Sequence, residues 1–174
     1  YGMYAYTDMA GAFNRTGLQG TYSYHIPFRA SQLSFGVSLT GFQFRIDENK
    51  MTLLDADDQL LLNTEKSALI PDANFGVYYT DAHIYAGVSA MQLFQSPLKM
   101  GADKDGPGFK MMRHYFLMAG YRFEINRDLL LEPSFLLKTT DQFVSQLDVN
   151  VKTYIKEYYW AGLSFRTGGS YSIV

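Results

Sequence analysis

Apolar and polar side chains alternate with a period of two residues along most of this sequence. In the segment 146–155 (QLDVNVKTYI) one set holds Leu147, Val149, Val151 and Ile155, and the other holds Gln146, Asp148, Asn150 and Lys152. A β-strand points successive side chains to opposite faces, whereas a helix repeats about every 3.6 residues. The pattern therefore predicts an all-β protein, and no amphipathic helix of comparable quality competes with it.

Similar segments predict nine or ten strands, most of them about ten residues long. The expected strands lie at 1–6, 17–26, 32–41, 73–80, 84–93, 113–125, 129–139, 146–155, 158–167 and 170–174. In the third of these, the apolar phase flips near Gly41 into Phe42, Phe44 and Ile46. Such a flip indicates either a bulge or the place where the strand leaves its apolar layer.

The connections between these strands alternate between short and long. Long loops are expected at 47–70 and 94–112, and tight turns at 27–31, 81–83, 126–128 and 156–157. All tight turns would then lie at one end of the sheet, as in an antiparallel up-and-down transmembrane β-barrel of the outer membrane. The alternative is a water-soluble sandwich or lipocalin-like barrel, but its outward residues would be richer in Lys, Glu and Asp.

The chain is expected to form a single β-barrel domain over residues 1–174. Because it begins inside one alternating segment (YGMYAY) and stops inside another (SYSIV), it is expected to be an interior portion of a larger barrel, truncated at both ends. A self-contained barrel is the alternative, if residues 1–6 pair with 171–174. Both readings follow from the need to pair every strand edge that touches lipid.

The segment 121–138 (YRFEINRDLLLEPSFLLK) shows how side chains are assigned to the lipid side and the lumen side of the predicted barrel. Leu131, Phe135 and Leu137 would face lipid, while Glu132 and Lys138 would face the lumen. Pro133 is expected to forfeit one ladder hydrogen bond, because proline has no N–H to donate, and to cause a bulge or distorted pairing there.

Charged residues of both signs fall on the predicted lumen side. This lumen network is Arg122, Glu124, Glu132, Lys138, Asp148, Lys152 and Arg166. Mixed signs favour internal ion pairs and a filled lumen over an ion pore, whose lining usually has one sign. Five glycines share this side: Gly36, Gly76, Gly87, Gly120 and Gly162. They either allow strong curvature or the close approach of a loop or a neighbouring strand, or only reflect the tolerance of barrel strands for glycine.

Composition excludes several other functions. The net charge of −2 and the pI near 5.9 argue against nucleic-acid binding, and the absence of cysteine leaves no thiolate metal site. None of His25, His83 and His114 has a Ser or Asp at motif spacing, so no catalytic residue is predicted. No cofactor is expected, although Asp55, Asp57 and Asp58 form a weak calcium candidate that a solvated acidic loop explains better.

Four stretches resemble the PorP/SprF family of type IX secretion system membrane proteins. They are LSFGVSLTGFQFRID (33–47), PDANFGVYYTDAHIYAGVSAMQLFQ (71–95), RHYFLMAGYRFEINRDLLLEPSFLLK (113–138) and QLDVNVKTYIKEYYWAGLSFR (146–166). The resemblance implies an outer-membrane barrel that is not an enzyme and that works with type IX secretion components. It also implies, for some members, a secreted or surface-anchored protein partner such as an adhesin used in gliding motility. Members of the family run longer at both ends, and the family has no catalytic motif to transfer.

The long loops are the expected docking surface for such a partner. The partner-binding residues proposed from the sequence are Asp55, Asp57, Asp58, Lys104, Asp105 and Phe109. Two other functions remain open: a channel or transport barrel for small or hydrophobic solutes, and an enzyme of the barrel-hydrolase kind.

Overall fold

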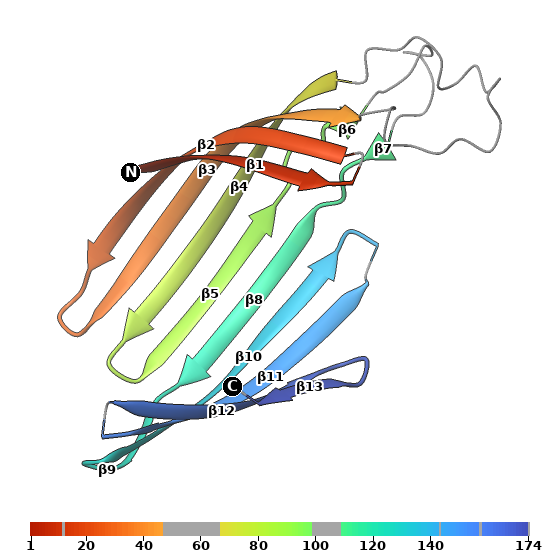
Figure 1. Ribbon diagram of the computed structural model, residues 1–174. Coiled ribbons are helices and arrows are strands. Elements are labelled where there is room, and N and C mark those ends of the chain that lie inside the picture. The colour runs from red at the N-terminus through yellow and green to blue at the C-terminus, as the bar shows by residue number, and fades with distance from the viewer. Residues whose placement is uncertain (12, 47–66, 99–108, 143, 157, 174) are drawn as a thin grey trace. The chain divides into compact units, whose positions relative to one another are not determined.

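The protein is all-β in the part of the chain that the structure describes (Figure 1). This computed structural model describes residues 1–11, 13–46, 67–98, 109–142, 144–156 and 158–173. The strands are β1 (Gly2–Ala10), β2 (Phe13–Pro27), β3 (Ser31–Ile46), β4 (Ser67–Asp81), β5 (Ile84–Met91), β6 (Pro97–Leu98), β7 (Phe109–Lys110), β8 (His114–Tyr121), β9 (Phe123–Asn126), β10 (Leu129–Thr140), β11 (Ser145–Ile155), β12 (Tyr159–Arg166) and β13 (Ser170–Ile173). These residues contain no helix long and apolar enough to cross a membrane.

Eleven strands form one up-and-down sheet. Their order is β1-β2-β3-β4-β5-β8-β10-β11-β12-β13, with β9 pairing to β10 beside β8, and the described pairings are antiparallel. This confirms the predicted fold class; the expected strand 113–125 is divided into β8 and β9. In this order β1 and β13 are not neighbours, so the pairing of 1–6 with 171–174 is not found among the described residues.

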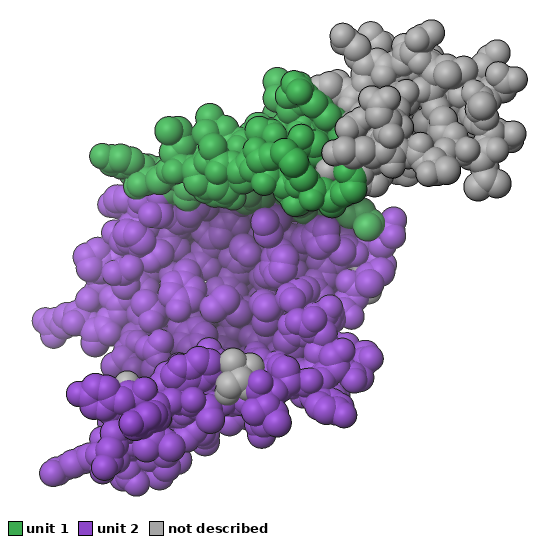
Figure 2. Space-filling model, viewed as in Figure 1, with its two compact units in different colours: residues 1–22, 37–74, 92–112 green, residues 23–36, 75–91, 113–174 purple. Residues whose placement is uncertain are grey.

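The chain divides into two compact units, coloured separately in Figure 2. Unit 1 comprises residues 1–22, 37–74 and 92–112, and unit 2 comprises 23–36, 75–91 and 113–174. Strands β2, β3 and β4 contribute residues to both, so each unit is described by its own contacts.

Unit 2 exposes apolar residues on one face and buries carboxylates on the other. In β11, Val149 is 42% exposed and its neighbour Asp148 only 6%; Leu117 in β8 is 40% exposed. The register keeps apolar and polar residues on separate faces across neighbouring strands, because Phe135 pairs with Val149 while Ser134 pairs with Asn150. A water-soluble sheet buries its apolar row, so this polarity contradicts the soluble alternative.

Unit 1 contains the β1–β2 hairpin, which is longer than the sequence predicted. The two strands pair from Gly2↔Thr21 to Ala10↔Phe13, through polar residues such as Asp8 and Arg15 that hide the apolar alternation. Its turn at Gly11, like the β12–β13 turn at 167–169, lies at the end of the sheet where the long loops were expected. The prediction that all tight turns share one end is therefore wrong.

The phase flip near Gly41 is a change of chemistry within one continuous strand. Thr40 donates a hydrogen bond to Gln19 of β2 (2.9 Å), and Phe42, next on the same face of β3, lies buried against Arg15. The Arg15 Cζ atom is 3.9 Å from the Phe42 ring centroid, within the range of a cation–π contact. The inward row thus turns from hydroxyl and amide groups to an aromatic ring.

The pairing of β10 is distorted at Pro133, as expected, and the distortion is an interruption of one ladder. On one side Pro133 pairs with Val151 of β11, but on the other side the pairing of β10 with β8 starts at Ser134 and that with β9 ends at Leu131. Because proline lacks the N–H that this ladder would need, β8 and β9 are separated opposite it. A register shift between Leu129 and Leu130 follows in the β9 ladder.

Two of the predicted inner glycines each accommodate a tyrosine from the neighbouring strand. Gly87 is opposite Tyr78, and a Cβ added there would lie 3.1 Å from the ring. Gly120 is opposite Tyr85, and an added Cβ would overlap its ring. Gly17, which the sequence analysis did not select, holds Tyr6 in the same way in unit 1. Gly36, in contrast, would place a Cβ within 4 Å of no described atom.

The β4–β5 turn is held by one carboxylate. Asp81 accepts hydrogen bonds from the backbone N–H groups of Ile84 (2.6 Å) and His83 (2.7 Å), and from the Tyr79 hydroxyl (3.1 Å). These donors, the Ile84 N–H first and the His83 N–H next, lower the pKa of Asp81 below its usual value. The turn therefore depends on the ionised carboxylate.

The two faces of unit 2 are expected to differ in a lipid bilayer. Because the chain contains no cysteine, single cysteines at Leu117, Val149, Asn150 and Ser164 can each carry one spin label. Labels at 117 and 149 should be accessible to lipid-soluble oxygen, and labels at 150 and 164 should not, as measured by power-saturation spin resonance. Equal oxygen accessibility at 149 and 150 would contradict the assigned polarity.

The contribution of Asp81 to stability should depend on pH. A carboxyl whose pKa is lower in the folded state stabilises fully above its unfolded pKa, and this stabilisation is lost as the pH falls through the folded value. The variant Asp81→Ala should therefore unfold at lower denaturant concentration than the parent at neutral pH, and the difference should shrink below about pH 4. Denaturant titrations across this range test it, and a difference that widens with acidity would refute it.

Candidate functional site

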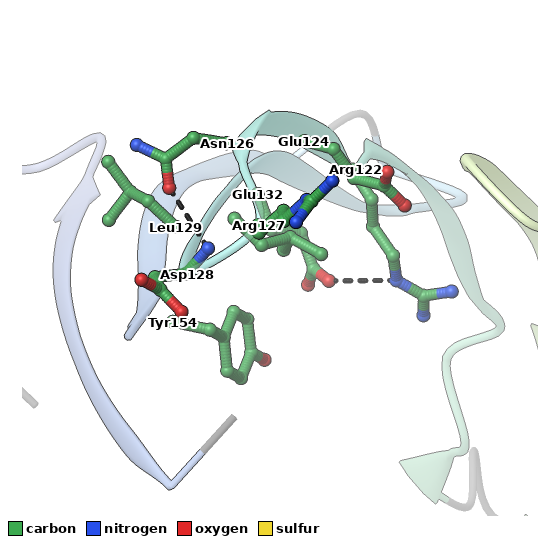
Figure 3. Close-up of a pocket in the computed structure, with 9 residues that line it drawn as sticks. Arg122, Glu124, Asn126, Arg127, Asp128, Leu129, Glu132 and Tyr154 are labelled. Atoms are coloured by element: carbon green, nitrogen blue, oxygen red, sulfur yellow. Dashed lines mark hydrogen bonds and ion pairs between the residues drawn. The ribbon is translucent and has the colours of Figure 1, made fainter. Parts of the chain in front are cut away.

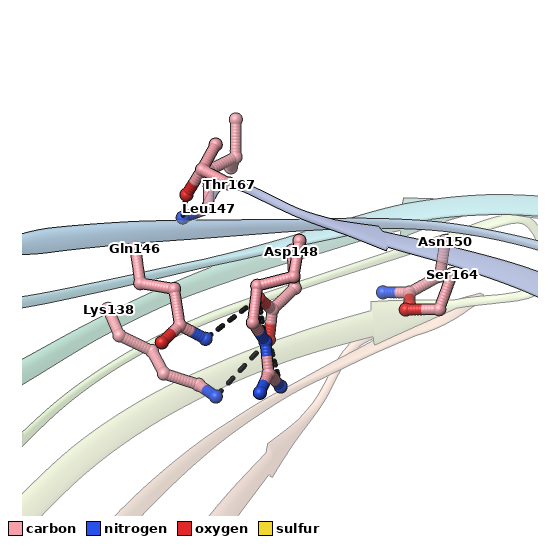
Figure 4. A network of polar contacts seen from close by, with 8 residues as sticks. Lys138, Gln146, Leu147, Asp148, Asn150, Ser164 and Thr167 are labelled. Atoms are coloured by element: carbon pink, nitrogen blue, oxygen red, sulfur yellow. Dashed lines mark hydrogen bonds and ion pairs between the residues drawn. The ribbon is translucent and has the colours of Figure 1, made fainter. Parts of the chain in front are cut away.

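Asp148 is the centre of a charge cluster on the polar face of unit 2 (Figure 4). Arg166 binds it with two hydrogen bonds, Nε to Oδ1 (2.8 Å) and Nη2 to Oδ2 (3.1 Å). Lys138 Nζ lies 3.2 Å from Oδ2, and Gln146 donates to Oδ1 at 2.9 Å. One buried carboxylate therefore links β10, β11 and β12, with the two-pronged geometry that a guanidinium provides.

The sheet register explains this convergence. Asp148 is directly opposite Arg166 on β12. On β10 it is opposite Leu136, and Lys138 lies two residues further along that strand. Residues two apart on a strand share a face, and long side chains reach diagonal neighbours. Thus Lys138 and Arg166 approach Asp148 from its two sides.

A second cluster surrounds Glu132, at the ladder interruption beside Pro133. Arg122 Nε lies 3.1 Å from Glu132 Oε2, and the Tyr85 hydroxyl donates to Oε1 at 3.0 Å. The Arg122 Cζ atom also lies 5.3 Å from the centre of the Tyr85 ring. This cluster joins β5 and β10 through the segment between β8 and β9, where backbone pairing with β10 is missing.

A cavity of about 480 Å³ opens beside the Glu132 cluster, at the tight turn between β9 and β10 (Figure 3). The turn is shaped by Asn126, whose side-chain oxygen accepts a hydrogen bond from the Asp128 N–H at 3.0 Å. Glu124 and Arg127 also line the cavity, together with Tyr154 from β11. Its lining carries both signs of charge, so the cavity has no strong preference for an anion or a cation.

The structure brings together five of the seven residues predicted for the lumen network. Arg122 joins Glu132, and Lys138 and Arg166 join Asp148. Glu124 lies in the wall of the cavity, and Lys152 Nζ lies 5.7 Å from the Trp160 ring centre. Their position inside a lumen stays a prediction, but their pairing in opposite signs is the arrangement that the prediction requires.

A clasp in unit 1 fixes the segment that follows β5. Asp72 Oδ1 accepts a hydrogen bond from the Phe94 N–H (3.3 Å), Asn74 Oδ1 accepts one from the Gln92 N–H (3.2 Å), and the Ala73 carbonyl accepts one from the Leu93 N–H (3.0 Å). We call Asp72, Ala73 and Asn74 with residues 92–94 the loop clasp. Sequence analysis missed it; the only signal was a turn-forming PDAN motif placed within a strand.

Most of the predicted partner-binding residues lie outside the described residues. These are Asp55, Asp57, Asp58, Lys104 and Asp105, so the calcium candidate also lies there. Phe109 belongs to β7, which pairs with β6 inside the expected loop 94–112. The expected loop 47–70 is shorter than predicted, because β4 already begins at Ser67. No cluster of potential metal ligands occurs in the described part of the chain.

His25 lies in a hydrogen-bond network that its sequence spacing did not reveal. Its Nδ1 lies 2.8 Å from the Ser34 hydroxyl and 3.2 Å from Gln32 Nε2, and its Nε2 lies 3.4 Å from the Ser23 hydroxyl. Residues on neighbouring strands meet here across the β2–β3 turn. The ring nitrogens contact hydroxyl and amide groups, and this set supplies no carboxylate to orient a catalytic base.

The Asp148 cluster should stabilise the fold measurably. Asp148→Asn removes the charge that compensates Arg166 and Lys138 and should lower the free energy of unfolding by about 1–3 kcal/mol. Urea unfolding in detergent micelles can be followed through Trp160, the single tryptophan of the chain. Glu124→Gln, at an exposed carboxylate, should change the same free energy by less than about 0.5 kcal/mol. An equal decrease in the free energy of unfolding in the two variants would show that the Asp148 cluster does not stabilise the fold more than an exposed carboxylate does.

Comparison with known proteins gives one family. The family described as type IX secretion system membrane protein PorP/SprF matches residues 1–174. No curated protein and no solved structure matches the chain. The family match spans the whole chain and agrees with an antiparallel sheet that turns its apolar side outward. This protein therefore belongs to the PorP/SprF family of type IX secretion system membrane proteins.

Proposed function

We propose that this protein lies in the bacterial outer membrane and assists the export or surface anchoring of a partner protein, such as an adhesin of the gliding machinery. The observation that carries the proposal is the match of the whole chain to a type IX secretion membrane family. The exposed apolar row of β8, β10 and β11 supports it, because outer-membrane barrels present such a row to lipid. The protein acts here by holding other proteins, without catalysis.

The inner charge clusters support a filled lumen over an ion pore. Asp148 is neutralised by Lys138 and Arg166 from the neighbouring strands, and Glu132 by Arg122 from the segment between β8 and β9. Such pairs crosslink the strands, and in the described part of the chain both clusters carry both signs, whereas the lining of an ion pore usually has one sign. The barrel then serves as a rigid frame for its loops.

The loop clasp supports docking at the connection after β5. It fixes the backbone of residues 92–94 to β4 and leaves the Phe94 side chain 57% exposed. An aromatic side chain on a fixed backbone suits protein recognition, because little conformational entropy is lost on binding. Phe94 is thus a proposed contact with the secreted or surface-anchored protein. The partner-binding role of Asp55, Asp57, Asp58, Lys104, Asp105 and Phe109 stays a proposal from the sequence alone.

A pull-down with two matched variants tests this function. The full-length tagged protein, solubilised gently from its native membranes, should retain type IX components and a surface protein. Phe94→Ser should lower the amount of retained surface protein by roughly tenfold, as for the loss of one interface hot spot. Phe28→Ser is the control, because Phe28 is equally exposed (57%) but lies in the β2–β3 turn; it should leave the retained surface protein unchanged.

Two outcomes would count against the proposal. Retention of no secretion component and no surface protein by the parent would remove the docking function. A steady open current in planar bilayers, together with normal export in a strain lacking the protein, would favour the solute channel instead.

A further inference from the structure

A groove of about 510 Å³ lies on the apolar face of unit 2. Six apolar side chains line it: Ile84, Ala119, Tyr121, Pro133, Phe135 and Val149. Gly120 and Ser134 complete the lining. The alternation places the Ser134 side chain on the opposite face and Gly120 has none, so both supply the backbone floor. We call this the apolar groove. Its volume falls in the range of small-ligand sites, about 300–1,000 Å³.

The groove results from small side chains placed where the ladder is interrupted. Ala119 is opposite Phe135 on one side and Ala86 on the other, so a low strip crosses β5 and β8. Pro133 adds a compact ring at the point where β10 loses its pairing with β8 and β9. Larger side chains at Phe135 and Tyr121 form the walls.

The chemistry of the groove selects a hydrocarbon occupant. Its surface is almost entirely apolar and contains no charged group. The groove continues into the exposed apolar face that includes Leu117 and Val149, and the family to which the chain belongs is a membrane protein family. Hydrocarbon chains cover such a face in a bilayer, and a depression in the face gives one chain more contact than a flat surface would.

The aromatic groups at one end give the occupant a direction. The Tyr121 ring lies 4.3 Å from the Phe123 ring, between centroids, and 6.2 Å from the His83 ring in the β4–β5 turn. Amphipathic rings prefer the level of the lipid head groups. The head group of an occupant therefore belongs beside Tyr121 and His83, and its tail runs toward Val149.

We propose that the apolar groove binds one acyl chain of a membrane phospholipid, held more firmly than the surrounding lipids. This inference rests on the membrane placement in the proposed function, and it adds a specific ligand. Pro133 and Ala119 create the space, and Phe135, Tyr121 and Ile84 contact the chain along its length.

Native mass spectrometry of the full-length protein, purified from membranes in mild detergent, tests the groove. The parent should retain one phospholipid. Ala119→Trp fills the groove and should lower the retained fraction by at least roughly tenfold, the effect of losing about 1.4 kcal/mol of binding free energy. Ala161→Trp, at an exposed position on the same face of β12 outside the groove, should retain the phospholipid as the parent does. Equal retention in both variants, or a parent that carries only detergent or a protein-linked acyl chain, would overturn the proposal.

A second measurement needs no variant. A phospholipid with a photoreactive group on its acyl chain, reconstituted with the parent, should label peptides that contain Ala119, Pro133 or Val149 in preference to those around Ala161 and Leu163. Uniform labelling of the two regions would overturn the proposal even if Ala119→Trp fails to fold. Both measurements use purified protein without partners, so they are independent of the export function. A labelled groove in a protein that does not support export would refute only the proposed function. An unlabelled groove in a protein that supports normal export would refute only this inference.

Discussion

The structure depends on the requirement that a sheet surrounded by hydrocarbon must satisfy its own backbone hydrogen bonds. No water is available there to accept or donate, so strands pair along their length and each strand sorts its side chains by solvent. Apolar residues such as Val149 are exposed on one face, and carboxylates such as Asp148 are buried on the other. This one requirement explains the period of two in the sequence, the antiparallel order of the strands and the inversion of the usual burial pattern.

Turning charges inward creates a second problem, which the inner face solves in a consistent way. The buried carboxylates of Asp148 and Glu132 each meet a guanidinium, while the basic partners remain partly exposed. The cations also lie over aromatic rings: Arg122 over Tyr85, Lys152 over Trp160 and, in unit 1, Arg15 over Phe42. A ring face stabilises a cation without requiring another buried anion.

The fold could be predicted from the sequence because alternation is a local property. The segment 146–155 is recognisable as a strand without any knowledge of its neighbours, and the effect of Pro133 follows from its missing N–H. The long β1–β2 hairpin was underestimated because Asp8 and Arg15 lie where its apolar alternation fails. The mixed charges of the inner face were predicted as a set, but which charge meets which depends on register, as in the pairing of Asp148 with Arg166. The loop clasp and the contacts of His25 could not be predicted, because they join residues whose proximity exists only after the strands have paired.

The close fit of Tyr85 over Gly120 has a consequence for how changes spread through the sheet. The same tyrosine donates its hydroxyl proton to Glu132, which in turn binds Arg122. A single methyl group at position 120 would displace the ring, remove one of the two partners of Glu132, and leave Arg122 without the ring it covers. One carbon atom on β8 would thereby alter the polar contacts of β5 and β10, at the point where the backbone ladder is already incomplete. A side chain larger than hydrogen at position 120 would therefore require a different side chain at position 85, so the two positions form one packing unit.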